Sequence, residues 1–315
     1  MNNIDEILEI INDIPQPTEG YNFIEKDNVL WGKGVETECA FGIRATSNND
    51  CPITQTTKFL KVFINTKFKI SINGSETDEK ISIYVLKTKD LKHRETFVRL
   101  AVSMSDSLND AIMFKNFLEL KDLFANSKKA SKIELQGMYG ELFSMYFLKV
   151  NYGLDISCFY QKEEKRKFDF SLSETKKIEI KTTTKPERIH HFLHQQLDTD
   201  RYDIKIISIM LQKDDCGMSL LELVNECMDL FSNYLNVVLY IETYIKNLDN
   251  TDLDEIRFSI EYAKDNIRLF SAHDVPKLKE KNVEGVYNIE YDVDFTNVSP
   301  LSKNKFIDWA TKNRR

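Results

Sequence analysis

The sequence predicts an α/β protein with a mixed central sheet flanked by helices, preceded by a β-rich module and followed by an α+β extension. Three observations support this fold class. Short alternating apolar runs fill residues 22–105, and helical apolar spacing marks residues 108–125 and 133–150. Residues 205–212 form a continuous apolar run typical of a buried central strand. A helix followed by strands and a second helix is the order expected of α/β architecture.

Length and composition are those of a globular protein. A chain of 315 residues suggests one large domain or two to three small ones, and its 42% hydrophobic and 30% charged residues are ordinary values. We expect no membrane segment, because no apolar run approaches the roughly 20 residues that a membrane helix needs. The acidic N-terminus has no signal-peptide core, so we expect the protein to be cytoplasmic.

The cysteines and histidines do not indicate a structural metal site. The cysteines are odd in number and form no CxxC pair, which predicts free thiols: Cys39, Cys51, Cys158, Cys216 and Cys227. His190 and His194 lie four residues apart and could share a helix face as zinc ligands. No HExxH pattern accompanies them, so the zinc alternative is the less favoured one.

The net charge of −7 argues mildly against a nucleic-acid partner, but the charge is unevenly distributed. Residues 1–50 contain 3 basic and 10 acidic side chains, whereas residues 51–100 contain 10 basic and 5 acidic ones. Residues 161–205 contain 11 basic and 9 acidic side chains. DNA binding is therefore permitted by the charge pattern and is not required by it.

Residues 1–125 are predicted to form the N-terminal β-rich module. A helix over residues 4–14 ends at Pro15, and short strands follow at residues 59–64, 68–72, 81–85 and 97–104. The module carries lysines at positions 58, 61, 67, 69, 87, 89 and 92. They form either a solvated sheet face or a phosphate-contacting patch that helps to choose the DNA.

The polar residues 126–129 predict a boundary, after which residues 126–248 form a central domain. Residues 188–197 are predicted to be a helix or turn. Ser219 and Glu222 form a predicted capping box for a helix over residues 219–231, and residues 234–248 form another helix. In the extension, residues 249–315, two β runs at 256–263 and 267–270 are predicted to pair, and residues 286–295 to form one more strand.

Residues 168–182 are the most informative segment, because they read as two short strands joined by a polar turn. Side chains alternate between the two faces of a strand. Glu179 and Lys181 therefore point to one face, away from Ile180, and pairing of the strands brings Asp169 close to them. Two carboxylates beside an ammonium group suit a hard divalent cation and an activated water molecule.

This pattern resembles the PD-(D/E)xK site of restriction-endonuclease-like nucleases. Asp169 matches the first acidic residue, and Glu179, Ile180 and Lys181 match the (D/E)xK element; the proline of the motif is replaced by Phe168. The run of residues 179–184 and the later Gln-Gln-Leu at residues 195–197 resemble one subgroup most closely. That subgroup is the bacterial PD-(D/E)xK motif protein family, found beside restriction and phage-defence genes.

The resemblance implies a restriction-endonuclease-like core over residues 126–248 and a Mg²⁺-dependent DNA endonuclease in which Mn²⁺ can substitute. Asp169, Glu179 and the carbonyl of Ile180 would bind the metal. Lys181 would steer or deprotonate the attacking water and stabilise charge on the phosphate.

The family often carries a further glutamate on the preceding helix, and Glu141, which follows a glycine, is the expected one; Glu134 is its rival. Thr182 and Gln196 are candidate accessory residues of this site. Gln196 could equally be an ordinary polar side chain at the surface with no role in the site.

Two other functions stay open. A catalytically silent nuclease-fold subunit of a defence complex would be expected to lack Asp169, Glu179 or Lys181, and all three are present. An exonuclease or resolvase relative would share the metal site. The expected partners are DNA and either a second copy of the chain or other subunits of a restriction or defence system, with no membrane.

Overall fold

The computed structural model describes residues 3–47, 51–125, 128–160, 167–278 and 287–312. The chain divides into two compact units. Unit 1 comprises Met1–Lys129 and Ser232–Asn247, and unit 2 comprises Ala130–Phe231 and Leu248–Arg315. Among the described residues, no helix is both long enough and apolar enough to cross a membrane. All five cysteines are free thiols, as predicted.

Unit 1 combines a six-stranded sheet with helices. Its elements are α1 (Asn3–Asp13), β1 (Tyr21–Lys26), β2 (Val29–Gly34), β3 (Cys39–Arg44), β4 (Ile53–Thr56), β5 (Leu60–Ile72), β6 (Ser75–Leu86), α2 (Leu91–Met104), the 3₁₀ turn η1 (Ser105–Ser107), α3 (Asp110–Ala125) and α6 (Leu235–Ile245).

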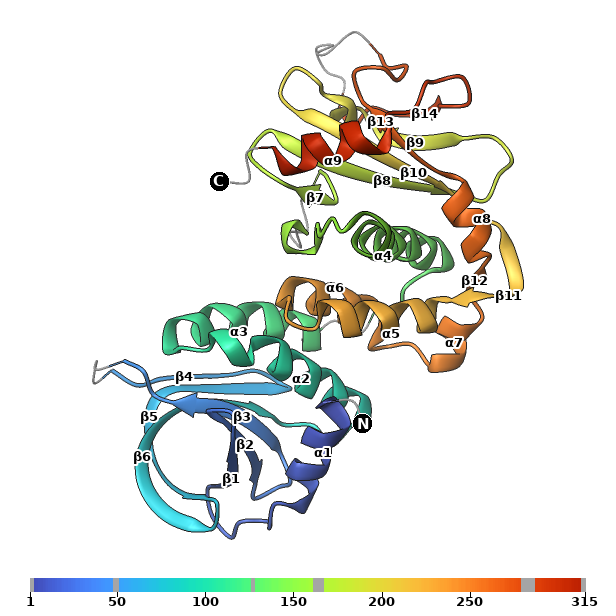
Figure 1. Ribbon diagram of the computed structural model, residues 1–315. Helices are drawn as coiled ribbons and strands as arrows, with labels where there is room; N and C mark the ends of the chain where they lie inside the picture. Colours follow the sequence, from blue (N-terminus) through green and yellow to red (C-terminus); the bar gives the residue numbers. More distant parts are fainter. Residues whose placement is uncertain (1–2, 48–50, 126–127, 161–166, 279–286, 313–315) are drawn as a thin grey trace. The chain divides into compact units, whose positions relative to one another are not determined.

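The sheet of unit 1 closes on itself. Its strand order is β1-β2-β3-β6-β5-β4, and β1 also pairs in parallel with β5, so five strands form a closed ring (Figure 1). The interior is filled by buried apolar side chains such as Phe23, Leu30, Ile70 and Ile83. Closure removes the open edges that β1 and β5 would otherwise expose to solvent.

Two sequence predictions in unit 1 are corrected. The runs at 59–64 and 68–72 are one strand, β5, which bulges at Asn65, where φ is 49° and the backbone N–H donates to Ser82 Oγ. Residues 97–104 form the end of helix α2 and are not a strand. Asp90 caps this helix by accepting from the N–H of His93, and its apolar residues recur with helical spacing.

Helix α6 packs within unit 1 although its neighbours in sequence belong to unit 2. The side chain of Glu242 is fully buried and accepts hydrogen bonds from Thr96 Oγ1 at 2.6 Å and Arg99 Nη1 at 2.9 Å, both on α2. A buried carboxylate needs such partners, because desolvation would otherwise be costly. These bonds fix α6 against α2.

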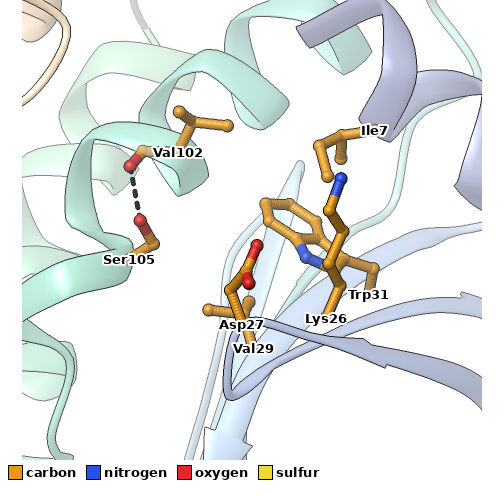
Figure 2. Close-up of a pocket in the computed structure, with 7 residues that line it drawn as sticks. All are labelled: Ile7, Lys26, Asp27, Val29, Trp31, Val102 and Ser105. Atoms are coloured by element: carbon orange, nitrogen blue, oxygen red, sulfur yellow. Dashed lines mark hydrogen bonds between the residues drawn. The ribbon is translucent and has the colours of Figure 1, made fainter. Parts of the chain in front are cut away.

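One small pocket of unit 1 is shown in Figure 2. It has a volume of about 40 Å³ and is lined by residues that include Trp31, Lys26 and Ser105. Small-molecule sites typically occupy about 300–1,000 Å³. This pocket has room for water only, so it does not suggest a ligand site.

Unit 2 contains the remaining elements. These are α4 (Lys132–Tyr152), η2 (Ser157–Phe159), β7 (Phe170–Ser171), β8 (Lys176–Thr183), β9 (Ile189–Leu193), η3 (His194–Leu197), β10 (Asp203–Met210), β11 (Lys213–Ser219), α5 (Leu220–Phe231), α7 (Asn250–Asp254), β12 (Arg257–Phe258), α8 (Ile260–Asp265), β13 (Ile267–Ser271), β14 (Glu290–Asp294) and α9 (Lys303–Thr311).

The central sheet of unit 2 is mixed, with strand order β13-β10-β8-β7 (Figure 1). β8 pairs antiparallel with β7 and parallel with β10, and β10 pairs antiparallel with β13. Helix α4 packs on one face, where Gly140 lies against Ile180 and Thr182. The two-stranded β9–β14 ribbon covers the other face, where Phe192 packs with Ile206. The unit is therefore a mixed α/β structure.

Several helix predictions in unit 2 are confirmed. Helix α4 covers the predicted segment and begins with a capping box between Ser131 and Glu134. Helix α5 begins with the predicted reciprocal bonds between Ser219 and Glu222. Capping chemistry was sufficient to place the start of α5, whereas helical apolar spacing predicted α4.

Three predictions in this part of the chain are corrected. Residues 188–197 are the strand β9 followed by the 3₁₀ turn η3, where a helix or turn was expected. The predicted hairpin of 256–263 with 267–270 does not exist, because Ser259 caps helix α8 and β13 pairs with β10. The division at residues 125, 248 and 315 also differs from the observed units, since residues 232–247 belong to unit 1 and residues 248–315 complete unit 2.

The contact between α4 and β8 depends on the absence of a side chain at Gly140. A Cβ atom there would lie 2.2 Å from Thr182 Cγ2, whereas a Cβ at Gly137, one turn earlier, would have no neighbour within 4 Å. We predict that Gly140→Ala lowers the free energy of unfolding by about 1–3 kcal/mol through overpacking. Gly137→Ala should raise it by up to about 1 kcal/mol through helix propensity.

Urea unfolding of both variants measures these effects. Adding Thr182→Ser, which removes the clashing methyl group, should restore part of the stability lost in Gly140→Ala. Equal stability of the Gly140→Ala and Gly137→Ala variants would contradict the close packing of α4 on β8.

Candidate active site

The alternation of side chains along β8 builds the centre of the site. Ile178 and Ile180 are buried, and Ile180 lies on the face covered by α4. Glu179 and Lys181 lie on the opposite face, where Lys181 Nζ is 2.8 Å from Glu179 Oε1. One eight-residue strand therefore supplies both an apolar packing surface and an acid–ammonium pair.

Asp169 directly precedes β7 and is held at the end of the β7–β8 ladder. Its Oδ2 accepts a hydrogen bond of 2.7 Å from the backbone N–H of Ile180, two residues beyond the pair Phe170–Ile178. The N–H and C=O of one strand residue point to the same side. The carbonyl of Ile180 is therefore directed to the strand edge that Asp169 occupies.

Glu179 is 2% exposed, and its two oxygens have different surroundings. Oε1 accepts from Lys181 and from Gln196 Nε2, the latter at 2.6 Å. Oε2 is buried and has no hydrogen-bond partner among the described residues. Burial, and then the negative charge of Asp169, raise the pKa of Glu179 from 4.5 to about 8, although the ammonium of Lys181 opposes this shift. Burial and Asp169 therefore disfavour the charged form of Glu179 more than Lys181 favours it.

Gln196, in the turn η3, bridges the acid and the lysine. Its Oε1 accepts from Lys181 Nζ at 3.1 Å and from the N–H of Leu193 at 3.1 Å. Its Nε2 donates to Glu179 and to the carbonyl of Lys167. From the sequence, Gln196 could be either an accessory site residue or an ordinary exposed polar side chain. In the structure its amide group contacts both Glu179 and Lys181.

The other two site candidates lie on the side of α4. Glu141 follows Gly140 in α4 and is partly buried. Its negative charge also raises the pKa of Glu179, but by less than burial or the charge of Asp169. The methyl group of Thr182 faces Gly140, and its hydroxyl accepts from Gln136 Nε2 at 3.3 Å. Thr182 therefore contacts the helix and does not contact the acid–lysine pair.

The rival helix acid, Glu134, forms the capping box of α4 with Ser131. The two histidines do not share a helix face: His190 lies in β9 and is bonded to Ser208 Oγ, and His194 lies in η3 near the hydroxyl of Tyr291. The helical arrangement on which the zinc alternative depended is therefore absent.

Sequence reasoning missed Phe192. Its ring lies under Lys181, with Nζ 4.8 Å from the ring centroid. The signal that could have revealed it is the alternation of residues 189–193, in which His190 and Phe192 are the buried positions. Such a period of two predicts a strand with Phe192 facing inward.

The donor set fits a hard divalent cation. Asp169, Glu179 and the carbonyl of Ile180 offer oxygen ligands, which Mg²⁺ prefers. Oε2 of Glu179 is buried and has no hydrogen-bond partner among the described residues, so it is available as a ligand. Among the described residues, no three His, Cys, Asp or Glu side chains are gathered closely enough to hold a metal by themselves. The backbone carbonyl and water would have to complete the coordination.

The raised pKa of Glu179 predicts how stability depends on pH in metal-free buffer. Between pH 4.5 and about 8, the folded protein holds a proton that the unfolded chain releases, so stability falls as pH rises through this window. Each unit of pKa difference corresponds to about 1.4 kcal/mol. Glu179→Gln should remove this component and should melt at a higher temperature than the wild type at pH 9.

Thermal unfolding in EDTA from pH 5 to pH 9 measures the difference. Glu174→Gln, a change at an exposed residue of the β7–β8 turn, is the control and should follow the wild type. Parallel pH profiles of wild type and Glu179→Gln would contradict the raised pKa.

Comparison with known proteins adds one match. A family model described as "Putative PD-(D/E)XK family member, (DUF4420)" matches residues 15–296, which include both segments of unit 2 that form the central sheet. No curated protein and no solved structure matches the chain. Because the family model covers most of the chain, the chain belongs to this family of PD-(D/E)XK proteins.

Proposed function

We propose that the protein is a Mg²⁺-dependent DNA endonuclease of the restriction or phage-defence type, which hydrolyses phosphodiester bonds. The observation that carries the proposal is the grouping of Asp169, Glu179 and Lys181 at the β7–β8 hairpin in a chain of the PD-(D/E)XK family.

Asp169, Glu179 and the carbonyl of Ile180 would bind the cation, and Glu141 would bind a second one or orient the first through water. A bound Mg²⁺ or Mn²⁺ polarises a phosphate oxygen and lowers the pKa of coordinated water. The hydrogen bond from Ile180 N–H keeps Asp169 aligned for this role. Gln196 bonds to Glu179 Oε1, so Oε2, which has no hydrogen-bond partner among the described residues, would be the oxygen that binds the cation.

Lys181 would stabilise negative charge that develops on the phosphate, and would orient the attacking water. Its ammonium is held on one side by Glu179 Oε1 and Gln196 Oε1. A preorganised cation at the reacting phosphate needs no rearrangement as charge develops, which is the main benefit of such sites. Attack by water on phosphorus involves no covalent enzyme intermediate, so no serine, cysteine or histidine nucleophile is required.

DNA as the substrate is supported by the local excess of basic residues over residues 161–205, together with the family. The lysines of β5 are a weaker candidate for contact with DNA. Lys67 and Lys69 form diagonal ion pairs with Asp78 and Glu76 on β6, with N–O distances of 3.7 and 3.4 Å. Such pairs reduce the field available to phosphates. A second copy of the chain or other defence subunits would complete the assembly.

A second candidate is a silent nuclease-fold subunit that binds DNA or partner subunits without cleaving. The observation that favours it is the 2% exposure of Glu179, which Gln196 partly covers. The two functions differ in a simple assay, because only the first predicts plasmid nicking or linearisation that requires Mg²⁺ and stops in EDTA.

Lys181→Ala should abolish cleavage while leaving the fold and the DNA affinity nearly intact. Groups that act on the transition state typically contribute about 10²–10⁴-fold to the rate. Lys177→Ala is the matched control, since Lys177 lies on the same strand and bonds to Ser171 Oγ and the carbonyl of Ser173. Plasmid cleavage at saturating Mg²⁺ measures both variants, and cleavage at wild-type rate by Lys181→Ala would refute the assignment.

Asp169→Ala and Glu179→Ala should lose activity for another reason, because each removes a ligand of the cation. Calorimetric titration with Mn²⁺ should show at least about tenfold weaker binding in both variants. Glu134→Ala, which changes only the cap of α4, should bind Mn²⁺ like the wild type. Wild-type affinity in Asp169→Ala and Glu179→Ala would rule out the ligand roles even if cleavage were lost.

A further inference from the structure

The ammonium group of Lys181 has a third neighbour besides Glu179 and Gln196. Its Nζ lies 4.8 Å from the centroid of the Phe192 ring, over the face of the ring. The face of an aromatic ring carries partial negative charge and attracts a cation within about 6 Å. A carboxylate, an amide oxygen and a ring face therefore surround one ammonium group.

The Phe192 ring is itself held rigidly. It is fully buried and stacks on Phe295, with ring centroids 5.7 Å apart and planes inclined by 17°. Phe192 lies opposite Tyr291 in the β9–β14 ribbon. Since the next residue, Leu193, donates its N–H to Gln196 Oε1, the ribbon fixes the ring and the amide together. Lysine has a long and flexible side chain, so its position has to be set by such surroundings.

We infer that Phe192 is a positioning residue, whose ring face fixes the Lys181 ammonium beside Glu179 and Gln196 for phosphodiester cleavage. The role in cleavage rests on the proposed function, whereas the contact itself does not. The attraction to Glu179 alone would allow the ammonium to approach either carboxylate oxygen. The ring face adds a third attraction to the ammonium, which lies 2.8 Å from Oε1, and so limits the positions that the flexible side chain can adopt.

The contrasting explanation is that Phe192 is only an apolar wall for the methylene groups of the lysine, as many side chains beneath a lysine are. A leucine or a fluorinated ring would serve as such a wall equally well. The two explanations therefore differ in whether the electron density of the ring face matters, and fluorination of the ring tests this with little change of shape.

The first experiment observes the contact without metal or DNA. In ¹³C-lysine-labelled full-length protein, the ε-methylene signal of Lys181 is assigned by its loss in Lys181→Arg. Protons above a ring face resonate upfield, so this signal should be shifted in the wild type and in Phe192→Tyr, and should return to the ordinary lysine position in Phe192→Leu. Phe270→Leu is the matched control, because Phe270 is equally buried in the same cluster and contacts Phe295.

The second experiment measures cleavage of a DNA duplex with Mg²⁺ by protein that carries mono-, di- or trifluorinated phenylalanine at position 192. We expect kcat to fall progressively, by about tenfold in total, with KM within about twofold of the wild type. The same amino acids at position 270 should leave kcat within about twofold. These variants keep the volume of the ring, so the test does not depend on whether Phe192→Leu folds.

A Lys181 signal that stays upfield in Phe192→Leu would overturn the contact. A kcat that is unaffected by fluorination at position 192, or equally affected at position 270, would overturn the role in positioning. If the wild type cleaves no DNA, the proposed function and the role of Phe192 in cleavage both fail, and the NMR shift then decides the contact alone: its loss in Phe192→Leu supports the contact of Lys181 with the ring and its retention refutes it.

Discussion

The alternation of side chains along β8 is the constraint on which the site depends. Both faces of this strand are covered, by α4 on one side and by the β9–β14 ribbon on the other. Neighbouring residues must therefore satisfy opposite demands: Ile180 packs on the helix, while Glu179 and Lys181 form a polar pair on the other face. A shift of register by one residue would bury the charges against α4, which fixes the register strongly.

Burial of Glu179 is the second determinant of the site. A buried carboxylate is tolerated only when charges or hydrogen bonds offset its desolvation. Lys181 and Gln196 satisfy Oε1, whereas Oε2 stays without a hydrogen bond and Asp169 adds repulsion. An additional cation beside Oε2 would offset this unfavourable burial. If the proposed function holds, the burial of Glu179 lowers the stability of the metal-free protein at a place where a cation would bind.

Segments that are far apart in sequence complete the unit. β13 pairs with β10 at the edge of the central sheet, and β14 pairs with β9, the strand that carries Phe192. The last part of the chain is therefore integral to the site, although it was predicted to be a separate extension. Residues 232–247 leave this unit altogether and form α6 of unit 1. The functional unit is defined by pairing of strands and is not contiguous in sequence.

The sequence by itself determined the features that local chemistry encodes. Apolar spacing placed α4, a capping box placed α5, and the alternation of residues 168–182 placed the β7–β8 hairpin with Glu179 and Lys181 on one face. The tertiary structure alone decided the rest. Short apolar runs such as residues 97–104 fit either a helix or a strand until their packing is known. The approach of Gln196 and Phe192 to the acid–lysine pair follows from the pairing of β9 with a strand about 100 residues later. No local pattern specifies that pairing, because its free energy comes from contacts that exist only in the folded chain.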